Sequence, residues 1–335
     1  MPITVVYFHR KPSPTLFSLE RVFADVRAHL PEDIRPVVAN CPRESKGILN
    51  RVINMLWARR HQGDLNHITG DVHYLTYLMR KDRTILTIHD CVSLERSRGL
   101  KHLLLWFLWY WFPGKRCAKI TVVSEYTKSQ LLRLITCAPG KIAVIHNPYC
   151  VRLKPSPGRF NADCPVILQI GTGWNKNLER VAVVLKGIRC RLVVVGGLDE
   201  DQRRCLLENG IQYTQHQGIS DEKLLSLYEE CDLVIFASLY EGFGLPIIEA
   251  QATGRPVVTS NRCSMPEVAG NAADLVDPES AESIRAGILR VLRDKTNREA
   301  LVQKGLENVL RFEPGYIAAQ YAELYREIAR HQPRL

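Results

Sequence analysis

The stretch that decides the fold reads Leu233-Val-Ile-Phe-Ala-Ser-Leu-Tyr-Glu-Gly-Phe-Gly-Leu-Pro-Ile-Ile-Glu249. Its apolar beginning predicts a buried strand. Pro246 fits the first position of a helix, because the N–H that it lacks would have no partner there, and Gly254 suits the helix end. Strand and helix are therefore joined by a glycine-rich turn whose backbone amides can face an anion. Because Glu241 and Glu249 flank this turn, the segment predicts a phosphate-sized site between two carboxylates.

The alternation of strand and helix continues along the chain. Apolar runs predict strands at residues 3–8, 84–88, 120–123, 166–170, 191–195, 211–214, 233–237 and 256–259. Helical patterns follow several of them, at residues 17–30 and from residue 125 onward. This order is typical of parallel sheets built from βαβ units, so we expect an α/β protein.

Three parts are expected along the chain. A length of 335 residues exceeds what one core usually supports. The proline-rich stretch Lys154-Pro-Ser-Pro-Gly158 can be neither helix nor inner strand and predicts a linker. We therefore expect a first Rossmann-like domain at residues 1–155, a second at 156–312, and a helix at 313–335 that packs back toward the first domain.

Charge is concentrated in the first half of the sequence. Residues 1–160 contain 25 Lys and Arg against 11 Asp and Glu, whereas the remainder contains 20 against 24. A basic half can serve nucleic acid, an anionic membrane, a phosphorylated ligand or a solvated surface. The basic residues form no dense run and no aromatic RNA-binding motif accompanies them, which argues against nucleic acid.

One aromatic segment has two interpretations. It reads Leu103-Leu-Leu-Trp-Phe-Leu-Trp-Tyr-Trp-Phe112, with Lys101 and Lys115 beside it. It falls well short of the roughly 20 residues that cross a bilayer. It is either a helix buried between strands or a peripheral membrane contact with an aromatic face and a basic flank.

The ten cysteines include no Cys-x-x-Cys or Cys-x-x-His pair, so neither a zinc site nor a disulfide framework is expected. The N-terminus shows no secretion signal. We therefore expect reduced thiols and a cytoplasmic protein, peripheral on the inner face of the membrane if the aromatic segment contacts lipid.

Residues after the predicted strands are the first candidates for function, because parallel sheets bind ligands beyond the carboxyl ends of their strands. Gly171-Thr-Gly-Trp-Asn-Lys-Asn177 offers close backbone approach and the cation of Lys176 to a diphosphate, although a plain turn is the alternative. The loop 215–221 can face a base, and His89 follows the strand at 84–88. Acid and base catalysis by Glu241 and Glu249, as in glycoside hydrolysis, also stays open at this point.

The segment from Ser238 to Val258 resembles the signature of the family 4 glycosyltransferases. Three further segments agree in order and spacing, at residues 122–131, 171–177 and 266–270. The resemblance implies the GT-B fold, in which two Rossmann-like domains have parallel sheets that face a central cleft. It also implies retaining transfer of a hexose from a nucleotide diphosphate sugar, with no required nucleophile.

The resemblance implies a role for each matching residue. Glu241 contacts the donor sugar, Glu249 the ribose hydroxyls, Lys176 the diphosphate, and His89 lies near the transferred sugar. The full donor-binding set is Gly171, Thr172, Lys176, Asn177, Ile219, Gly242, Phe243, Gly244, Leu245 and Glu249. The expected acceptor-binding residues are Phe17, Ser18, His67 and Asp71.

The sequence departs from the family pattern in two loops. No arginine precedes Lys176 in its loop, so neutralisation of the diphosphate rests on that lysine, and the first loop, residues 9–18, lacks the usual glycine pair. The one Asp-x-Asp sequence is Asp199-Glu-Asp201, and Lys176 supplies the cation at the diphosphate, so we expect metal-independent chemistry without a cofactor.

The function predicted from the sequence is transfer of a hexose, with mannose and GDP favoured, to a lipid-linked glycan acceptor in bacterial surface polysaccharide synthesis. The alternatives are an epimerase or phosphorylase with the same fold, or a non-enzymatic basic adaptor.

Overall fold

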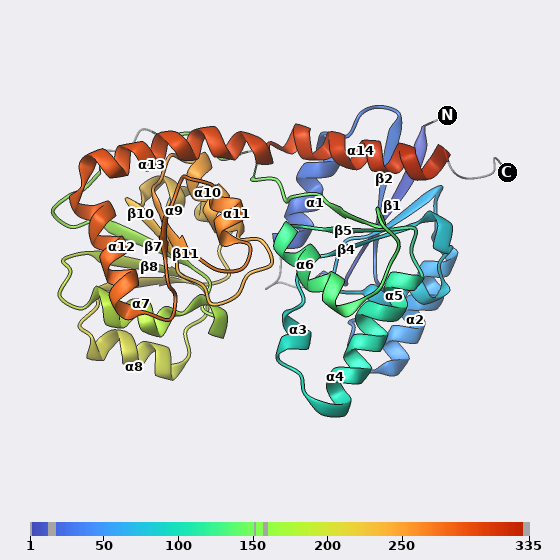
Figure 1. Ribbon diagram of the computed structural model, residues 1–335, viewed down its shortest axis with the longest axis horizontal. Coiled ribbons are helices and arrows are strands. Elements are labelled where there is room, and N and C mark those ends of the chain that lie inside the picture. Colours follow the sequence, from blue (N-terminus) through green and yellow to red (C-terminus); the bar gives the residue numbers. More distant parts are fainter. Residues whose placement is uncertain (1, 13–17, 151, 157–159, 331–335) are drawn as a thin grey trace. The chain divides into compact units, whose positions relative to one another are not determined.

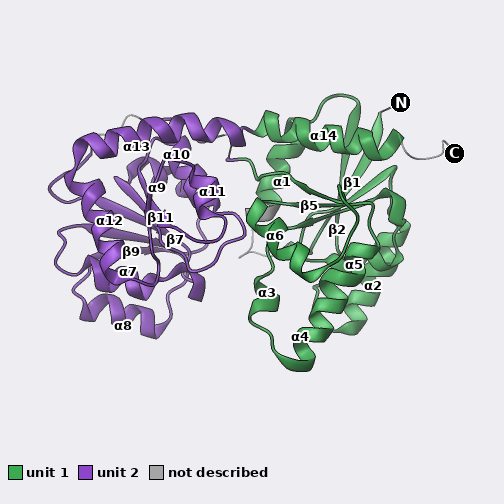
Figure 2. Cartoon of the chain, in the orientation of Figure 1, with its two compact units in different colours: residues 1–148, 314–335 green, residues 149–313 purple. Residues whose placement is uncertain are grey.

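The computed structural model describes residues 2–12, 18–150, 152–156 and 160–330. The chain forms two compact units (Figure 2). Unit 1 comprises residues 1–148 and 314–335, and unit 2 comprises residues 149–313. The sequence placed the first boundary seven residues later and the second one residue earlier than this division.

Unit 1 contains a six-stranded parallel sheet, of which Figure 1 labels β1, β2, β4 and β5. The strand order is β2-β1-β3-β4-β5-β6. Its strands are β1 (Ile3–His9), β2 (Ile34–Asn40), β3 (Leu65–Ile68), β4 (Thr84–Ile88), β5 (Lys119–Val122) and β6 (Ile142–Val144). Its α-helices before the linker are α1 (Ser18–Ala28), α2 (Ile48–Arg60), α3 (Val92–Glu95), α4 (Gly99–Leu105), α5 (Phe112–Lys115) and α6 (Glu125–Leu134). The 3-10 helices η1 (His73–Leu78) and η2 (Lys81–Arg83) precede β4, and the π-helix η3 (Trp106–Trp111) joins α4 to α5.

Unit 2 contains a second six-stranded parallel sheet, with the order β12-β11-β10-β7-β8-β9. Its strands are β7 (Val166–Ile170), β8 (Arg191–Val195), β9 (Tyr213–His216), β10 (Leu233–Phe236), β11 (Val257–Ser260) and β12 (Asp274–Val276). Its helices are η4 (Trp174–Lys176), α7 (Leu178–Leu185), α8 (Glu200–Glu208), α9 (Asp221–Glu230), α10 (Leu245–Ala252), α11 (Met265–Ala269), α12 (Ala281–Arg293), α13 (Lys295–Asn308) and η5 (Val309–Phe312).

The inner strands are buried on both faces, as parallel sheets require. All residues of β4 and β10 are buried, which explains why mainly apolar runs marked both strands in the sequence. The pattern did not reveal β2, β3, β6 or β12. β2 is an edge strand that contains Pro36, and its Val37 and Val38 are 38% and 47% exposed, so it lacks a buried run.

The C-terminal helix α14 (Pro314–Arg330) packs within unit 1, against α1 and β1. Its Tyr321 and Tyr325 are buried, and the hydroxyl of Tyr325 lies 2.8 Å from that of Tyr7. On the surface, Arg326 donates two hydrogen bonds of 2.7 Å to Asp33. The helix is therefore held by a buried polar contact as well as by apolar packing.

The aromatic segment forms one continuous helical stretch, α4–η3–α5. Tyr110 is buried, while Trp106 and Trp109 are partly buried against the core. Leu103 and Leu104 are 54% and 50% exposed, so a helix buried on all sides is the wrong interpretation.

None of the described helices combines the length and the apolar character needed to cross a bilayer. All ten cysteines are free, and six of them are buried.

Candidate active site

The candidate site in unit 2 lies at the edge of the sheet where the parallel strands β7, β10 and β11 end. The loop 171–177 follows β7, the loop 237–244 follows β10, and the loop 261–264 follows β11. Parallel strands place these loops side by side, at the edge where such sheets bind ligands.

Lys176 and Glu241 form an ion pair at this edge. The Nζ atom of Lys176 donates a hydrogen bond of 2.6 Å to Oε1 of Glu241, and Nδ2 of Asn175 donates to the same oxygen at 3.1 Å. The two paired side chains are only 21% and 14% exposed. Nζ also lies 4.6 Å from the centroid of the Phe236 ring. Lys176, expected at the diphosphate, and Glu241, expected at the donor sugar, are thus in direct contact.

Gly171 makes room for the lysine side chain. Its φ angle is +88°, and a Cβ atom at this position would lie 2.9 Å from Cε of Lys176. A larger residue would be strained and would also displace the lysine. This glycine therefore determines the path of Lys176 across the turn.

Ser264 fastens the loop that carries Glu241. Its hydroxyl lies 3.0 Å from the carbonyl oxygen of Glu241 and 2.8 Å from that of Phe243, and can donate to either. Asn175 ties the neighbouring loop to the same segment, because its Nδ2 donates to the carbonyl of Tyr240 at 2.9 Å. Side chains from two neighbouring loops thus hold the backbone around Glu241 and so fix the position of its carboxylate.

Helix α10 begins immediately after the glycine-rich turn. Gly244 has a φ angle of +111° and precedes the first helical residue, and Pro246 is the second. The positive end of the helix dipole therefore lies at the turn, as an anion site requires. Glu249 on this helix is 3% exposed, and its Oε2 accepts a hydrogen bond of 2.8 Å from the hydroxyl of Tyr228.

Two family descriptions match the chain and together span nearly all of it. "Glycosyltransferase Family 4" matches residues 3–151, and "Glycosyl transferases group 1" matches residues 154–308. The chain belongs to the group 1, family 4 glycosyltransferases. It is accordingly a glycosyltransferase enzyme, as the sequence predicted.

Three curated relatives resemble this glycosyltransferase over much of its length. "O-antigen chain mannosyltransferase B" of Escherichia coli is 29% identical over 76% of this chain and 72% of its own length. "MMP alpha-(1->4)-mannosyltransferase" of Mycolicibacterium hassiacum is 28% identical over 72% of this chain and 65% of its own length. "N,N'-diacetylbacillosaminyl-diphospho-undecaprenol alpha-1,3-N-acetylgalactosaminyltransferase" of Campylobacter jejuni is 27% identical over 50% of this chain and 46% of its own length.

Among solved structures, the sucrose-phosphate synthase of Thermosynechococcus elongatus superposes with a TM-score of 0.79 at 18% identity. The alignment covers 98% of this chain and 100% of that one. Together with the two parallel sheets, this likeness confirms the predicted two-domain GT-B fold.

In unit 1 of the glycosyltransferase, His89 follows β4. Its Nε2 donates to the carbonyl of Thr69 at 2.8 Å, and its buried Nδ1 has no hydrogen-bond partner among the described residues. Burial lowers the pKa of His89 to about 4, so the ring is neutral near pH 7. A neutral ring that donates through Nε2 presents Nδ1 as a hydrogen-bond acceptor.

The acceptor-binding role predicted for His67 is wrong. The side chain is 0% exposed, with Nδ1 2.7 Å from the hydroxyl of Tyr325 and Nε2 2.7 Å from that of Thr87. Both ring nitrogens are thus used inside unit 1, and the histidine anchors α14. Of the other predicted acceptor residues, Phe17 lies outside the described residues and Ser18 is the first residue of α1.

Asp71, another predicted acceptor residue, is exposed. It follows β3, and its Oδ1 accepts a hydrogen bond of 2.8 Å from Nε1 of Trp109. This contact ties the loop after β3 to the aromatic segment.

The side chain of Asn177 is a structural support and not the donor ligand that the sequence predicted. It is buried, and its Nδ2 donates to the carbonyls of Ala237 and Pro278 at 3.0 and 2.7 Å. Its φ angle of +61° ends the turn that carries Lys176.

The other predicted donor residues occupy the loops at the same edge of the sheet. Thr172 donates to the carbonyl of Gly197 at 2.6 Å, and Ile219 is half-buried between β9 and α9. Gly242 and Phe243 are buried in the turn, and Leu245 begins α10. No group of three His, Cys, Asp or Glu side chains in the described part of the chain is placed to hold a metal ion.

The sequence missed three residues that support the site: Asn175, Ser264 and Tyr228. Asn175 lies within the quoted lysine loop, and Ser264 stands two residues before Pro266 in a matching segment, so proximity to motifs could have indicated both. Nothing in the sequence marks Tyr228, which comes from α9.

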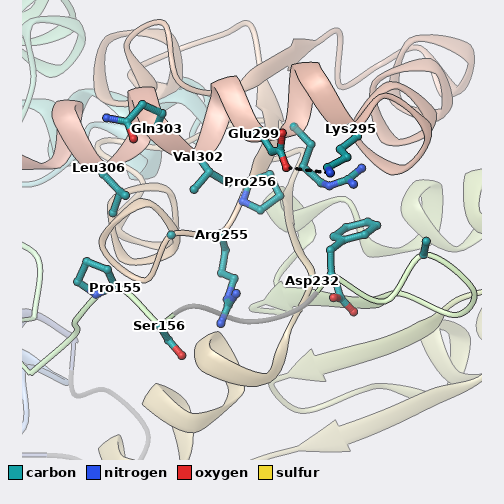
Figure 3. A pocket seen from close by; sticks show the side chains of 14 residues that line it. Pro155, Ser156, Asp232, Arg255, Pro256, Lys295, Glu299, Val302, Gln303 and Leu306 are labelled. Carbon is teal, nitrogen blue, oxygen red and sulfur yellow. Dashed lines mark ion pairs between the residues drawn. The ribbon is translucent and has the colours of Figure 1, made fainter.

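A cavity of about 620 Å³ in unit 2 lies elsewhere (Figure 3). Its lining includes Asp232 and Pro256, which directly precede β10 and β11. It therefore opens at the amino ends of the strands, away from the loops that carry Lys176 and Glu241.

Proposed function

We propose that this glycosyltransferase moves a mannosyl residue, with retention of configuration, from a nucleotide diphosphate mannose to a glycan in bacterial surface polysaccharide synthesis. GDP is the favoured nucleotide, and the reaction needs no metal. The paired Lys176 and Glu241 at the carboxyl edge of the unit 2 sheet carry this proposal. The names of two relatives, both mannosyltransferases, support the choice of sugar.

In this proposal the donor lies against the start of α10. The diphosphate faces the glycine-rich turn, where the helix dipole attracts negative charge. The buried carboxylate of Glu249 accepts hydrogen bonds from the ribose hydroxyls, while Tyr228 holds its Oε2 in place at 2.8 Å. Charged hydrogen bonds to two neighbouring hydroxyls are strong and geometrically selective, so the arrangement fits a nucleoside.

Lys176 assists departure of the nucleoside diphosphate. As the bond between the sugar C1 and the phosphate oxygen breaks, negative charge grows on that oxygen, and a preplaced cation stabilises it without a metal. Glu241, released from part of its ion pair, accepts a hydrogen bond from a hydroxyl of the mannosyl group and orients C1. Neither carboxylate transfers a proton in this scheme.

Retention follows from attack on the face that the diphosphate leaves. The acceptor oxygen forms its bond to C1 as the C1–O phosphate bond breaks, and its proton passes to the departing phosphate oxygen. The neutral Nδ1 of His89 accepts a hydrogen bond from a sugar hydroxyl, a role that a protonated imidazole could not perform.

The acceptor is proposed to be a lipid-linked glycan at the anionic inner face of a membrane. Exposed apolar side chains on α4, including Leu103 and Leu104, support a peripheral contact with lipid. The excess of Lys and Arg in residues 1–160 favours an anionic surface.

The test is a transfer assay with a panel of UDP-, GDP- and ADP-sugars, a glycan acceptor, and determination of the anomeric configuration of the product. We expect α-linked mannose from GDP-mannose, the same rate in EDTA, and loss of transfer in Glu241→Gln. A β-linked product would contradict the proposal. Transfer of another sugar without any transfer of mannose would also contradict it.

A further inference from the structure

A second cavity, of about 550 Å³, lies wholly within unit 1. Its apolar wall is formed by Leu100, Leu104, Leu105, Leu108 and Trp109, from α4 and η3. Its volume falls in the range of about 300–1,000 Å³ that is usual for small-molecule sites. A wall of four leucines and a tryptophan suits a hydrocarbon chain and not a sugar.

The cavity opens at the ligand-binding edge of the unit 1 sheet. Its lining includes Asp71, which follows β3, and Ser93, which lies four residues beyond His89 after β4. Asp71 is also close enough to His89 to oppose the lowering of that histidine's pKa. The cavity lining therefore comes in part from the segments that follow β3 and β4, the second of which also carries His89.

Two cations border the apolar wall. The guanidinium of Arg51, from α2, stacks 4.6 Å from the centroid of the Trp109 ring, and its Nε donates to the carbonyl of Ser45 at 3.0 Å. No acceptor among the described residues takes a hydrogen bond from the two terminal nitrogens of Arg51. Lys101 is exposed and forms no ion pair within the described part of the chain. Both cations can therefore bind an anion at the rim.

The apolar surface extends beyond the cavity. The wall residue Leu100 of α4 is 72% exposed, and outside the cavity lining Ile48 and Leu49 of α2 are 80% and 73% exposed. Arg51 lies on α2 and contacts Trp109 of η3, so these helices are neighbours. Exposed apolar residues in this number are typical of a surface that meets lipid.

The π-helix η3 fixes the shape of the cavity. The carbonyl of Leu108 accepts a hydrogen bond from the hydroxyl of Tyr77, and that of Trp109 lies 2.8 Å from Nδ1 of His73. Trp106 donates to the carbonyl of Leu134 at 2.6 Å. Side chains from η1 and a backbone carbonyl at the end of α6 thus hold an unusual helical turn in place, and such turns occur frequently at functional sites.

We infer that this cavity binds the lipid end of the acceptor: the hydrocarbon chain lies along Leu100, Leu104 and Leu108, and its phosphate or diphosphate is bound by Arg51 and Lys101. This inference rests on the proposed function and adds to it the site that recognises the lipid carrier. An open groove with two cations at its rim fits a single chain with an anionic head, whereas a flat bilayer contact would need neither. One relative is named for a diphospho-undecaprenol-linked acceptor, which has this chemistry.

The first experiment measures binding of farnesyl phosphate by tryptophan fluorescence and calorimetry, which does not require transferase activity. The variants are Leu104→Asn and Lys101→Gln. Their matched controls are Leu132→Asn, whose leucine is 51% exposed against 50% for Leu104, and Lys81→Gln, another exposed lysine of unit 1. Circular dichroism verifies that each variant is folded.

We expect Leu104→Asn to weaken farnesyl phosphate binding about tenfold, because it removes part of the apolar wall. Lys101→Gln should weaken binding about threefold at low salt and less at high salt, since the rim is exposed. The controls should bind as the wild type does, and farnesol or inorganic phosphate should bind much more weakly. Equal binding by Leu104→Asn and Leu132→Asn would overturn the inference, and so would absence of binding to the wild type.

The second experiment separates a carrier site from a membrane contact and from the proposed reaction. If Leu104→Asn lost affinity for phosphatidylglycerol vesicles but kept its affinity for farnesyl phosphate, the surface would be a bilayer contact and the inference would fail. With a glycan acceptor that has or lacks the lipid, the ratio of the two kcat/KM values should fall about tenfold in Leu104→Asn. Absence of transfer to either acceptor would overturn the proposed function. The farnesyl phosphate measurement would still show whether the cavity binds a lipid phosphate.

Discussion

Lys176→Met separates the two roles that the ion pair with Glu241 can have. Methionine keeps an apolar side chain of similar length over Gly171 and removes the charge. The carboxylate left behind is 14% exposed and retains the 3.1 Å hydrogen bond from Asn175. Exposed ion pairs contribute about 0–1 kcal/mol, whereas breaking a buried pair costs about 3–5 kcal/mol. For this intermediate burial we expect a loss of about 1–2 kcal/mol in local stability.

The expected loss of activity is larger than the loss of stability. A group that stabilises charge developing in the transition state contributes about 100- to 1,000-fold to kcat, or roughly 3–4 kcal/mol. Lys176→Met should therefore lower kcat by about two to three orders of magnitude, with a smaller change in the affinity for the donor.

A double variant distinguishes the roles. Glu241→Gln in the Lys176→Met background removes the unpaired carboxylate, so local stability should recover by about 1 kcal/mol. Transfer activity should not recover, because the cation at the diphosphate is still missing.

The assays are hydrogen exchange of peptides from β10 and α10, which reports local opening, and steady-state transfer kinetics. Lys295→Met serves as the control, because Lys295 belongs to an exposed pair with Glu299 at 3.6 Å. Recovery of activity together with stability in the double variant would refute the reasoning, since the lysine would then act only by holding Glu241.

Two further predictions concern the nucleoside contact and the buried histidines. Glu249→Gln should raise the KM for the donor about tenfold and change kcat less, because a charged hydrogen-bond acceptor is lost; Tyr228→Phe should have a smaller effect of the same kind, and an unchanged KM in both would contradict the assignment. Burial lowers the pKa of His9 and His89 to about 4 and that of His67 well below its usual range. Between about pH 6.5 and 4 the unfolded chain therefore binds more protons than the folded one, so the free energy of unfolding should fall as the pH falls through this window. Urea unfolding at pH 7 and pH 5 should show this loss of stability. In His67→Gln, the slope of the free energy of unfolding against pH should correspond to up to about one bound proton fewer. Equal stability of the wild type at both pH values would exclude this explanation.

The sequence predicted the parts of the site that follow from local backbone chemistry. The strands at 166–170 and 191–195 have the bounds predicted for them, because mainly apolar runs mark strands buried on both faces. Helix α10 begins within one residue of the predicted start, because proline and glycine restrict the backbone wherever they occur. The placement of Glu241 before this helix and of Glu249 within it follows from the same local constraints.

The edge strands and the aromatic segment were harder to predict. β2 has no continuous apolar run, since one side of an edge strand is exposed. The composition of residues 103–112 alone is compatible with a buried helix and with an exposed one. The fold decides that Leu103 and Leu104 are exposed while Tyr110 is buried, and it brings His73 and Tyr77 from a different part of the chain to the carbonyls of the π-helix.

The sequence by itself thus determined the two α/β units, the turn that faces an anion, and the residue types at the site. The tertiary structure alone decided which groups meet. It paired Lys176 with Glu241, 65 residues apart, and enclosed His67 against Tyr325, 258 residues apart. It also turned the side chain of Asn177 inward, and joined Arg51 to Trp109 at the rim of a cavity. Apolar runs and turn residues act over a few positions along the chain, whereas these contacts depend on how strands from distant segments are ordered in a sheet, which no local pattern specifies.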